Sequence, residues 1–443
     1  MRLTRVMRRG AFSLAVSVLA LLSIPASAAA ATYYVATNGS DSNSGTSVSS
    51  PFKTMQHAAD LTNPGDTVYV RGGTYTFSGS SDALTISRSG DASGVITYAA
   101  YPGETPVIQF GGGAWEGINI RASYIDVNGF TVIGPAQSYA SKGWAGTNSP
   151  GTSSGTGNEA CIVAGYYNAS GPFYTHITVE NNTVSYCSET GIQALHADYL
   201  TIKNNIAHDN SWYSPYAGSG ISVYETYNSD SNTGTKISIT GNITYNNIEY
   251  VGLQGGSSIS DGEGIIIDDN KWSQHSGSAY TGRTLVANNV SYGNGGPGIE
   301  AFQSQHVDIV NNTVYQNQKN HSGNDGDLAP SVASDINLTN NISVPMSGKK
   351  ANASGSGFTY SHNLYYGSTA TTGTGDITGD PLFVSPGLTA GANFQLRSGS
   401  PAIGAGTSLL APLTDILGIT RSTNGYDIGA YEYSGSGGGT VTP

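Results

Sequence analysis

Charged residues are scarce in this sequence. Aspartate, glutamate, lysine and arginine make up 11% of the 443 residues, and 30 acidic against 18 basic side chains give a net charge of −12. A protein that binds nucleic acid needs a basic face, so the composition speaks against that partner. It also speaks against a polyanionic ligand, unless a bound cation reverses the local charge.

Cysteine and long apolar runs are equally sparse. The two cysteines, Cys161 and Cys187, could form a disulfide bond in an exported protein or could be two small buried side chains. The one extended apolar run, 11–24, is too short to span a bilayer comfortably. Four arginines precede it and small residues follow, the pattern of a secretory signal. We therefore expect 1–28 to be a signal peptide and the mature protein to be secreted or periplasmic, with no membrane association.

Good helix formers are also few, whereas turn formers are abundant. Glycine accounts for 60 residues, and asparagine, serine and threonine are frequent throughout. The hydrophobic fraction is nevertheless 37%, which is too high for a disordered low-complexity chain. These features predict many short strands joined by tight turns, in one elongated and monomeric domain.

Internal repetition defines the fold. A segment of alternating apolar residues that ends in an Asn pair recurs along the chain, and the shortest interval between copies is 22 or 23 residues. Alternation with period two predicts a strand with one buried face, and a strand repeated on every coil stacks on its previous copy. The last Asn of each copy is expected to form a structural ladder: Asn182, Asn205, Asn242, Asn289, Asn312, Asn341 and Asn363.

A second strand recurs beside the first and begins with glycine or another small residue, as at Gly191, Gly220 and Gly264. The sequence therefore predicts an all-β fold, a single-domain right-handed parallel β-helix over 32–433. Helical spacing in 51–61 predicts a short helix that caps the N-terminal end of the stack. Residues 434–443 are expected to be a flexible glycine-rich tail.

Several segments resemble the pectate-lyase-like β-helix proteins. The resemblance lies in 33–46 and 64–75 near the N-terminus, and in 380–383, 398–404 and 427–431 near the C-terminus. It implies the same fold over most of the chain. The superfamily contains lyases, hydrolases, epimerases and non-catalytic binders, so the fold alone does not fix the chemistry.

The insertions between repeats predict a groove over the glycine-led strands. Loops at 134–158, 211–219 and 245–262 rise on one side, and loops at 166–173, 226–234 and 271–282 rise on the other. The second residue after the small residue should face the groove, which gives Asn119, Ile162, Gln193, Ser222, Ile266 and Glu300. The fourth should face it too, which gives Arg121, Ala164, Leu195, Tyr224, Asp268 and Phe302. A long groove suits a polysaccharide or oligosaccharide.

Four acids within nine residues mark the candidate catalytic site: Asp261, Glu263, Asp268 and Asp269. Crowded carboxylates separate one another's pKa values, as acid–base catalysis requires. We therefore expect Asp261, Asp268 and Asp269 to be the catalytic candidates. The same four acids could instead bind Ca²⁺, or could simply keep an exposed sheet face hydrated.

Two family resemblances bear on this cluster. Calcium-dependent pectate lyases place a catalytic lysine a few residues after an Asp-Gly pair, but the chain has Ile266 after Asp261-Gly262. β-Helix glycosidases similar to lacto-N-biosidase use two aspartates seven residues apart, which Asp261 and Asp268 match. That role requires the chain to turn a corner at Gly262 or Gly264, because an extended link would hold the carboxylates too far apart.

Aromatic, acidic and basic side chains around the cluster are the expected sugar-binding residues: His196, Tyr224, Glu225, Glu263, Lys271, Trp272 and Glu300. We expect a glycoside hydrolase that uses paired carboxylates and requires no cofactor. One alternative is a Ca²⁺-dependent polysaccharide lyase, with Lys271 or Arg283 as the base. The other is a non-catalytic carbohydrate-binding surface protein.

Overall fold

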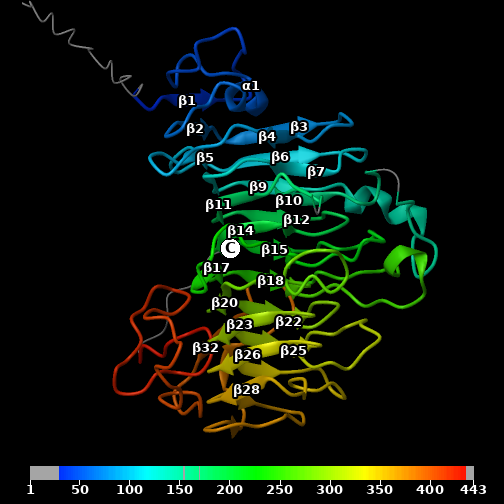
Figure 1. Ribbon diagram of the computed structural model, residues 1–443, viewed down its shortest axis with the longest axis vertical. Coiled ribbons are helices and arrows are strands. Elements are labelled where there is room, and N and C mark those ends of the chain that lie inside the picture. The colour runs from blue at the N-terminus through cyan, green and yellow to red at the C-terminus, as the bar shows by residue number, and fades with distance from the viewer. Residues whose placement is uncertain (1–28, 153–154, 169, 436–443) are drawn as a thin grey trace, which may run out of the picture.

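The computed structural model describes residues 29–152, 155–168 and 170–435, and it is a right-handed parallel β-helix (Figure 1). Three parallel sheets run the length of the stack. Sheet A contains β1 (Thr32–Val35), β2 (Thr67–Val70), β5 (Ile96–Ala100), β8 (Ile125–Asn128), β11 (Tyr174–Glu180), β14 (Ala197–Lys203), β17 (Thr235–Thr240), β20 (Arg283–Ala287), β23 (Gln305–Val310), β26 (Ser334–Thr339) and β28 (Phe358–Ser361).

The other two sheets complete each coil. Sheet B contains β3 (Gly73–Phe77), β6 (Pro106–Phe110), β9 (Thr131–Ile133), β12 (Thr183–Ser185), β15 (Ile206–His208), β18 (Ile243–Tyr245), β21 (Val290–Tyr292), β24 (Thr313–Tyr315), β27 (Ile342–Val344), β29 (Leu364–Tyr365) and β30 (Ile377–Thr378). Sheet C contains β4 (Leu84–Ile86), β7 (Glu116–Ile120), β10 (Ala160–Gly165), β13 (Ile192–Leu195), β16 (Ile221–Tyr224), β19 (Ile265–Asp268), β22 (Ile299–Phe302) and β25 (Leu328–Ser331).

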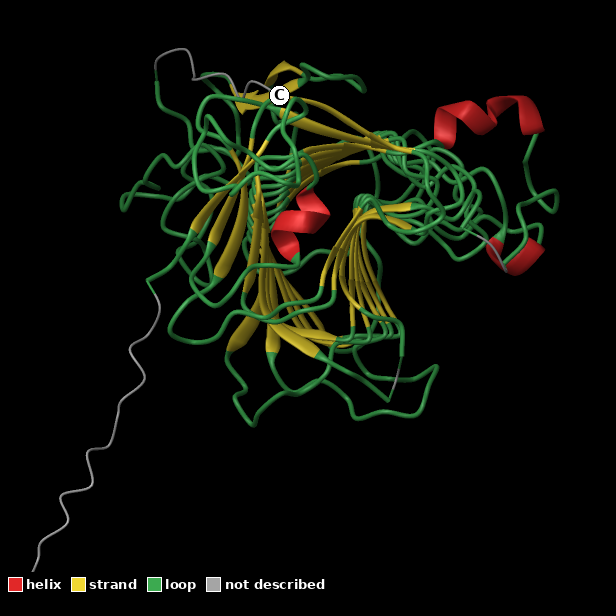
Figure 2. Ribbon diagram, turned by 90° about the horizontal axis from the view of Figure 1, so that it is seen from above, coloured by secondary structure: helices red, strands yellow, loops and turns green. Residues whose placement is uncertain are grey.

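One apolar core fills the stack from end to end. Each strand contributes its alternate residues, so that Ile221 lies between Ile192 and Ile265 in the register of sheet C. The predicted cap is the helix α1 (Met55–Ala59), which Thr54 begins by accepting a hydrogen bond from the backbone N–H of His57. Seen from above, this helix lies within the outline of the coils (Figure 2), as expected for a cap over the exposed core.

The predicted asparagine ladder is confirmed. The side-chain N–H of Asn205 donates to the Oδ1 of Asn242 at 3.0 Å, and each later member repeats this contact down to Asn363. Asp376 ends the row by accepting from the backbone N–H of Asn363 at 2.7 Å. Each Asn therefore satisfies buried polar groups at the corner between sheets A and B.

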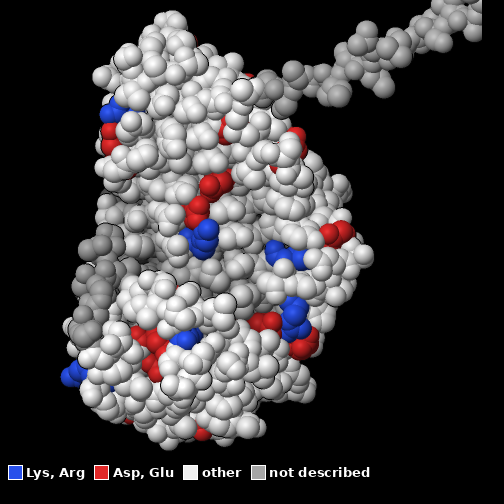
Figure 3. Space-filling view, turned by 90° about the vertical axis from the view of Figure 1, so that its left-hand side faces the viewer, with Lys and Arg blue, Asp and Glu red and all other residues white. Residues whose placement is uncertain are grey.

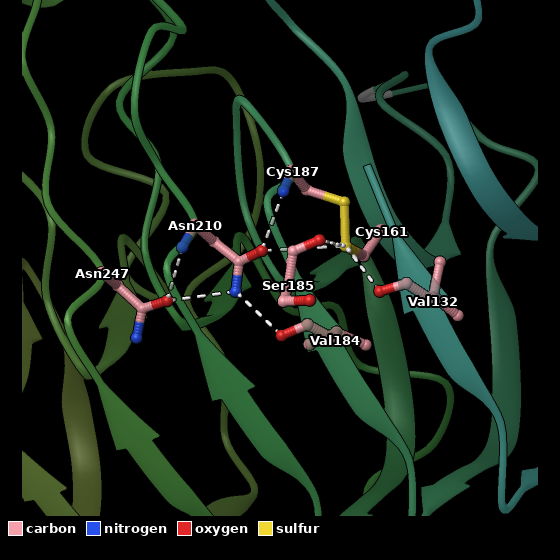
Figure 4. The surroundings of a disulfide bond; sticks show 7 residues. All are labelled: Val132, Cys161, Val184, Ser185, Cys187, Asn210 and Asn247. Atoms are coloured by element: carbon pink, nitrogen blue, oxygen red, sulfur yellow. Dashed lines mark hydrogen bonds between the residues drawn. A yellow bond between two sulfur atoms is a disulfide. The ribbon is translucent and has the colours of Figure 1, made fainter. Parts of the chain in front are cut away.

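A second ladder, which we did not predict, follows five residues later in each coil. Asn210, Asn247, Asn294 and Asn317 bond in the same way at the corner between sheets B and C. Cys187 occupies this position on the coil above, and its backbone N–H donates to the Oδ1 of Asn210 at 3.0 Å (Figure 4). Cys187 is bonded to Cys161, which settles the open question of the two cysteines in favour of the disulfide.

One coil differs from the predicted register. The sequence placed Ile162 and Ala164 in the groove, but Ile162 pairs with Ile118 and both side chains lie in the core. The outward residue is Val163, which pairs with Gln193. Ala160 had been taken as the small corner residue, whereas Cys161 holds that position. A shift of one residue moves every side chain to the opposite face of the strand.

The C-terminal segment leaves the stack after β30. It forms the antiparallel pair β31 (Phe383–Ser385) and β32 (Asn393–Leu396), and it packs Phe383 and Phe394 against Tyr292 and Tyr315 of sheet B. On the face toward the left of Figure 1, charged side chains form a few small groups separated by wide uncharged surface (Figure 3). Within the described residues, no helix is both long and apolar enough to cross a membrane. The expected signal peptide and most of the expected tail lie outside the described residues.

Candidate functional site

The outward face of sheet C is the floor of the candidate site. Tyr224, Asp268 and Phe302 follow one another across β16, β19 and β22 in one row, as predicted. Ser222, Ile266 and Glu300 form the neighbouring row on the same strands. Asp268 and Glu300 therefore lie on adjacent coils and in adjacent rows. Successive coils are about 4.8 Å apart.

Long loops stand on the side of the floor nearest sheet B, at the right of Figure 1. They carry the 3-10 helices η1 (Ala136–Lys142) and η2 (Leu253–Gly255). A β-bridge from Gly146 to Val251 joins the loops to each other, and Val251, Tyr139 and Tyr213 form a small apolar core of their own. This wall is therefore packed as a unit, and it leaves Tyr216 and Tyr250 exposed.

The chain turns the corner that the aspartate pair requires. Gly262 adopts a φ of 92°, a left-handed conformation that favours glycine. A side chain at Gly264 would meet the Ser291 hydroxyl at 1.9 Å and the carbonyl oxygen of Gly298 at 2.6 Å, so this position must also remain glycine. Beyond the effect of burial, the charge of Asp261 acts on the Asp268 carboxyl and raises its pKa.

Burial and mutual repulsion perturb the acids of the cluster. Burial, followed by the charge of Asp261, raises the pKa of Asp268 well above its usual range, and the same two causes act on Glu300. Burial also raises the pKa of Asp261, but the Ser260 hydroxyl and the charge of His321 oppose that rise. Asp268 therefore keeps its proton more readily than Asp261, and Asp261 ionises first.

Two of the predicted acids are engaged elsewhere. The carboxylate of Asp269 is fully buried and accepts from the backbone N–H groups of Ser273 at 2.6 Å and Gln274 at 2.8 Å. Glu263 is also fully buried and accepts from the Ser219 hydroxyl at 2.6 Å. Both acids hold the loops around the floor. Among the described residues, no group of three or more His, Cys, Asp or Glu side chains is arranged to hold a metal ion.

His196 and Glu225 form a buried pair beside the floor. The Nε2 of His196 lies 2.9 Å from the Oε2 of Glu225, and both side chains are 1% exposed. Trp272 stacks on His196 at 5.2 Å and donates its indole N–H to the carbonyl oxygen of Thr226. These three predicted sugar-binding residues thus pack beneath the surface, and Trp272 is placed to support a loop and not a sugar ring.

The structure also shows where the two basic residues of the lyase alternative lie. The Nζ of Lys271 donates to the backbone oxygen of Val332 at 2.9 Å at an exposed position. Arg283 begins β20 in sheet A, where it forms ion pairs with Asp308 and Asp335. Arg283 therefore lies outside the groove, and Lys271, at the start of its loop, is held against the chain that follows β25.

Two other cations, Arg121 and Lys350, flank the acid cluster; the sequence predicted that Arg121 faces the groove, whereas Lys350 was not predicted. Arg121 lies on the floor directly after β7, and its guanidinium stacks on Tyr166 at 4.5 Å without an ion pair to any described residue. The nearby Glu116 has its pKa raised to about 9 by burial and by Asp82, so it is neutral at pH 7 and leaves Arg121 uncompensated. At the other end of sheet C, a hollow of about 300 Å³ is lined by residues that include Ser331, Asp325 and Lys350.

His275 is the further residue that sequence reasoning missed. It lies on the loop after β19, and its Nδ1 is 2.6 Å from the Oε1 of Glu225. Fifty residues separate the two partners, and neither stands in a recognisable motif. Only the folded loop brings them together.

The comparisons with known proteins agree with this architecture. The family model described as Pel9A-like, right handed beta helix region matches residues 33–326. The chain belongs to this family. Pectate lyase L of Dickeya dadantii is 23% identical to the Pel9A-like chain over 430 residues, which cover 90% of each protein. A pectate lyase PEL9 from Emericella nidulans is 40% identical over 79 residues, only 18% of its own length.

One solved structure supports the fold of the Pel9A-like chain. The crystal structure of pectate lyase Pel9A superposes with a TM-score of 0.55 at 20% identity, and the match covers 90% of this chain and 96% of that one. At this identity the likeness establishes the β-helix and not the reaction. The chain is a carbohydrate-active β-helix protein similar to pectate lyases.

Proposed function

We propose that the Pel9A-like chain cleaves an acidic polysaccharide by β-elimination in the groove over sheet C. Membership of a family whose named relatives are pectate lyases is the observation that carries this proposal. In such a reaction a base removes a proton beside the uronate carboxylate, and the glycosidic oxygen leaves. The export pattern at 1–28 and the disulfide between Cys161 and Cys187 support action outside the cytoplasm.

The local charges in the groove suit an acidic polysaccharide better than the protein's net charge of −12 suggests. Arg121 lies four coils above Asp268, about 19 Å away at 4.8 Å per coil. Lys350 lines the hollow beyond the cluster on the other side. Between the two cations, burial and then the charge of Asp261 raise the pKa of Glu300, which favours its protonated form and weakens its repulsion of a substrate carboxylate.

Asp268 is the proposed acid for the leaving oxygen. It is partly exposed on the floor, and its raised pKa keeps the proton available near neutral pH. Its Oδ1 is buried and has no hydrogen-bond partner among the described residues. Asp268→Asn is expected to abolish turnover, to retain substrate binding, and to change the unfolding free energy by less than about 1 kcal/mol.

Hydrolysis is the second candidate, and the electrostatic interaction between Asp261 and Asp268 favours it. There Asp268 would protonate the leaving oxygen, and the more readily ionised Asp261 would act as base or nucleophile. Both routes share the groove and the acid. They differ in the product and in the role of Asp261.

The test is an assay on polygalacturonate, other uronate polymers and a panel of neutral glycans. Elimination predicts that ultraviolet absorbance and reducing ends rise together on a uronate polymer, with and without chelator. Reducing ends without new absorbance would establish hydrolysis instead. Activity that chelator removes and Ca²⁺ restores would contradict the metal-free step, and binding without any cleavage would make the chain a carbohydrate-binding protein.

A further inference from the structure

A carboxylate–histidine pair stands beside the groove floor. Glu225 follows directly after β16, and its buried carboxylate lies between two histidines. Its Oε2 faces His196 at 2.9 Å, and its Oε1 accepts from the Nδ1 of His275 at 2.6 Å. The two histidines differ in access, because His196 is 1% exposed whereas the His275 side chain is 44% exposed.

The hydrogen bonds fix where the protons lie. The Nδ1 of His196 is 2.9 Å from the backbone oxygen of Tyr166, and because a carbonyl only accepts, that nitrogen must carry a hydrogen. One further proton is shared between the Nε2 of His196 and the Oε2 of Glu225. The Oε1 of Glu225 is then the acceptor for the Nδ1–H of His275. The Nε2 of His275 is left with a lone pair, and no described residue donates to it.

The exposed imidazole contacts the row of floor residues that contains the proposed acid. The Tyr224 hydroxyl is 3.2 Å from the same Nδ1 of His275, and Tyr224 is the register partner of Asp268 in the adjacent strand. Tyr167, from a neighbouring loop on the same side of the floor, packs its ring edge-on against His275. The titratable groups that face His275 are therefore Glu225, Tyr224 and Tyr167, with Asp268 one coil away.

We propose that His275 is the base of the elimination, with Glu225 as the residue that positions it. This inference rests on the proposed function and supplies the base that Ile266 cannot provide. The Nε2 of His275 takes the proton from the sugar carbon beside the carboxylate, and the electrons of that C–H bond form the new C=C bond. The bond to the glycosidic oxygen breaks, and Asp268 gives that oxygen its proton. Proton exchange with water then restores both residues.

The activity test uses three variants. His275→Ala is expected to lower kcat by about 100-fold or more with little change in KM, as the loss of a general base does, and added imidazole should restore part of the rate. Glu225→Gln should lower kcat and shift the acid limb of the pH profile, because it changes the partner of the imidazole. His306→Asn is the control, because His306 makes a similar 2.6 Å contact with Asp335 on sheet A and should leave activity unchanged.

A second measurement separates this inference from the function on which it rests. Nitrogen NMR of the resting protein should show neutral His275 protonated at Nδ1, and this signal should change in Glu225→Gln. Protonation at Nε2 would overturn the proposal even if the enzyme is a lyase, as would a His275→Ala variant that retains a third or more of wild-type kcat. Wild-type protein that makes no unsaturated product from any uronate polymer would overturn the elimination itself.

Discussion

Asp261 and Asp268 differ in their surroundings more than in their chemistry. The Asp261 carboxylate receives a hydrogen bond from Ser260 and faces the charge of His321, whereas no hydrogen bond or positive charge lowers the pKa of Asp268. Sequence spacing picked out both aspartates because four acids stand within nine residues. It could not rank them, because the ranking depends on burial and on His321, which comes from two coils further on.

A change at Asp261 separates the two candidate reactions. Asp261→Asn removes the charge that, after burial, contributes most to the raised pKa of Asp268. If the reaction is elimination, activity survives and the alkaline limb of the pH–rate profile moves to lower pH, by up to about one unit. If Asp261 is the base of a hydrolase, the same variant is inactive at every pH. The profile of kcat against pH for the wild-type and Asp261→Asn proteins decides between them.

Arg121 is expected to recognise a substrate carboxylate. Arg121→Gln should weaken binding of an oligogalacturonate by about tenfold at low salt, which corresponds to about 1.4 kcal/mol. The methyl-esterified oligosaccharide should bind the two proteins alike. Arg71→Gln is the matched control, because Arg71 also stacks on a tyrosine but forms an ion pair with Glu104. Calorimetric titration on an Asp268→Asn background measures binding without cleavage, and equal loss for both oligosaccharides would exclude a charge-specific role.

The corner between sheets B and C holds the floor of the groove in place. Asn247 donates to the Oδ1 of Asn294 and to the carbonyl oxygen of Ala207, and its own Oδ1 accepts from Asn210. The first ladder was predictable because an Asn pair marks each copy. The second was not, because a single Asn five residues later resembles ordinary turn composition. The register of the Cys161 coil was misassigned for a related reason, since both Ala160 and Cys161 are small enough for the corner.

Loss of one ladder side chain should therefore be costly. Asn247→Ala leaves buried backbone and side-chain groups of Asn210 and Ala207 without partners, and each such group costs about 1–3 kcal/mol. We expect the unfolding free energy to fall by about 3 kcal/mol in urea titration. Asn424→Ala, at an exposed loop position, should cost less than about 0.5 kcal/mol. Equal effects of the two substitutions would contradict a structural role for the ladder.

The whole molecule combines one continuous core with an acidic groove. Repeat spacing and strand periodicity were enough to predict the parallel β-helix and two of its three sheets, because these follow from local patterns that recur on every coil. The packing of the C-terminal segment on sheet B and the meeting of Glu225 with His275 depend on contacts between distant segments. Such contacts leave no periodic signal in the sequence.

Buried acids should make the fold more stable in acid than in mild alkali. Burial raises the pKa values of Asp126, Glu189 and Asp327 to about 7 from their ordinary values of 3.8, 4.5 and 3.8. A raised folded-state pKa gives stability that is full below the unfolded value and is lost as pH rises through the folded value. The melting temperature should thus fall by several degrees between about pH 5 and pH 8. Asp126→Asn should flatten part of that slope, and a melting temperature that rises over this range would contradict the assignment.

The product of cleavage in heavy-oxygen water tests the central claim most directly. Elimination adds no water, so mass spectrometry of the products from a uronate polymer should show an unsaturated sugar one water lighter than its hydrolytic counterpart, with no heavy oxygen incorporated. Asp268→Asn should give no product under the same conditions. Saturated products that carry one heavy oxygen at each new reducing end would contradict β-elimination and would establish the groove as the site of a hydrolase.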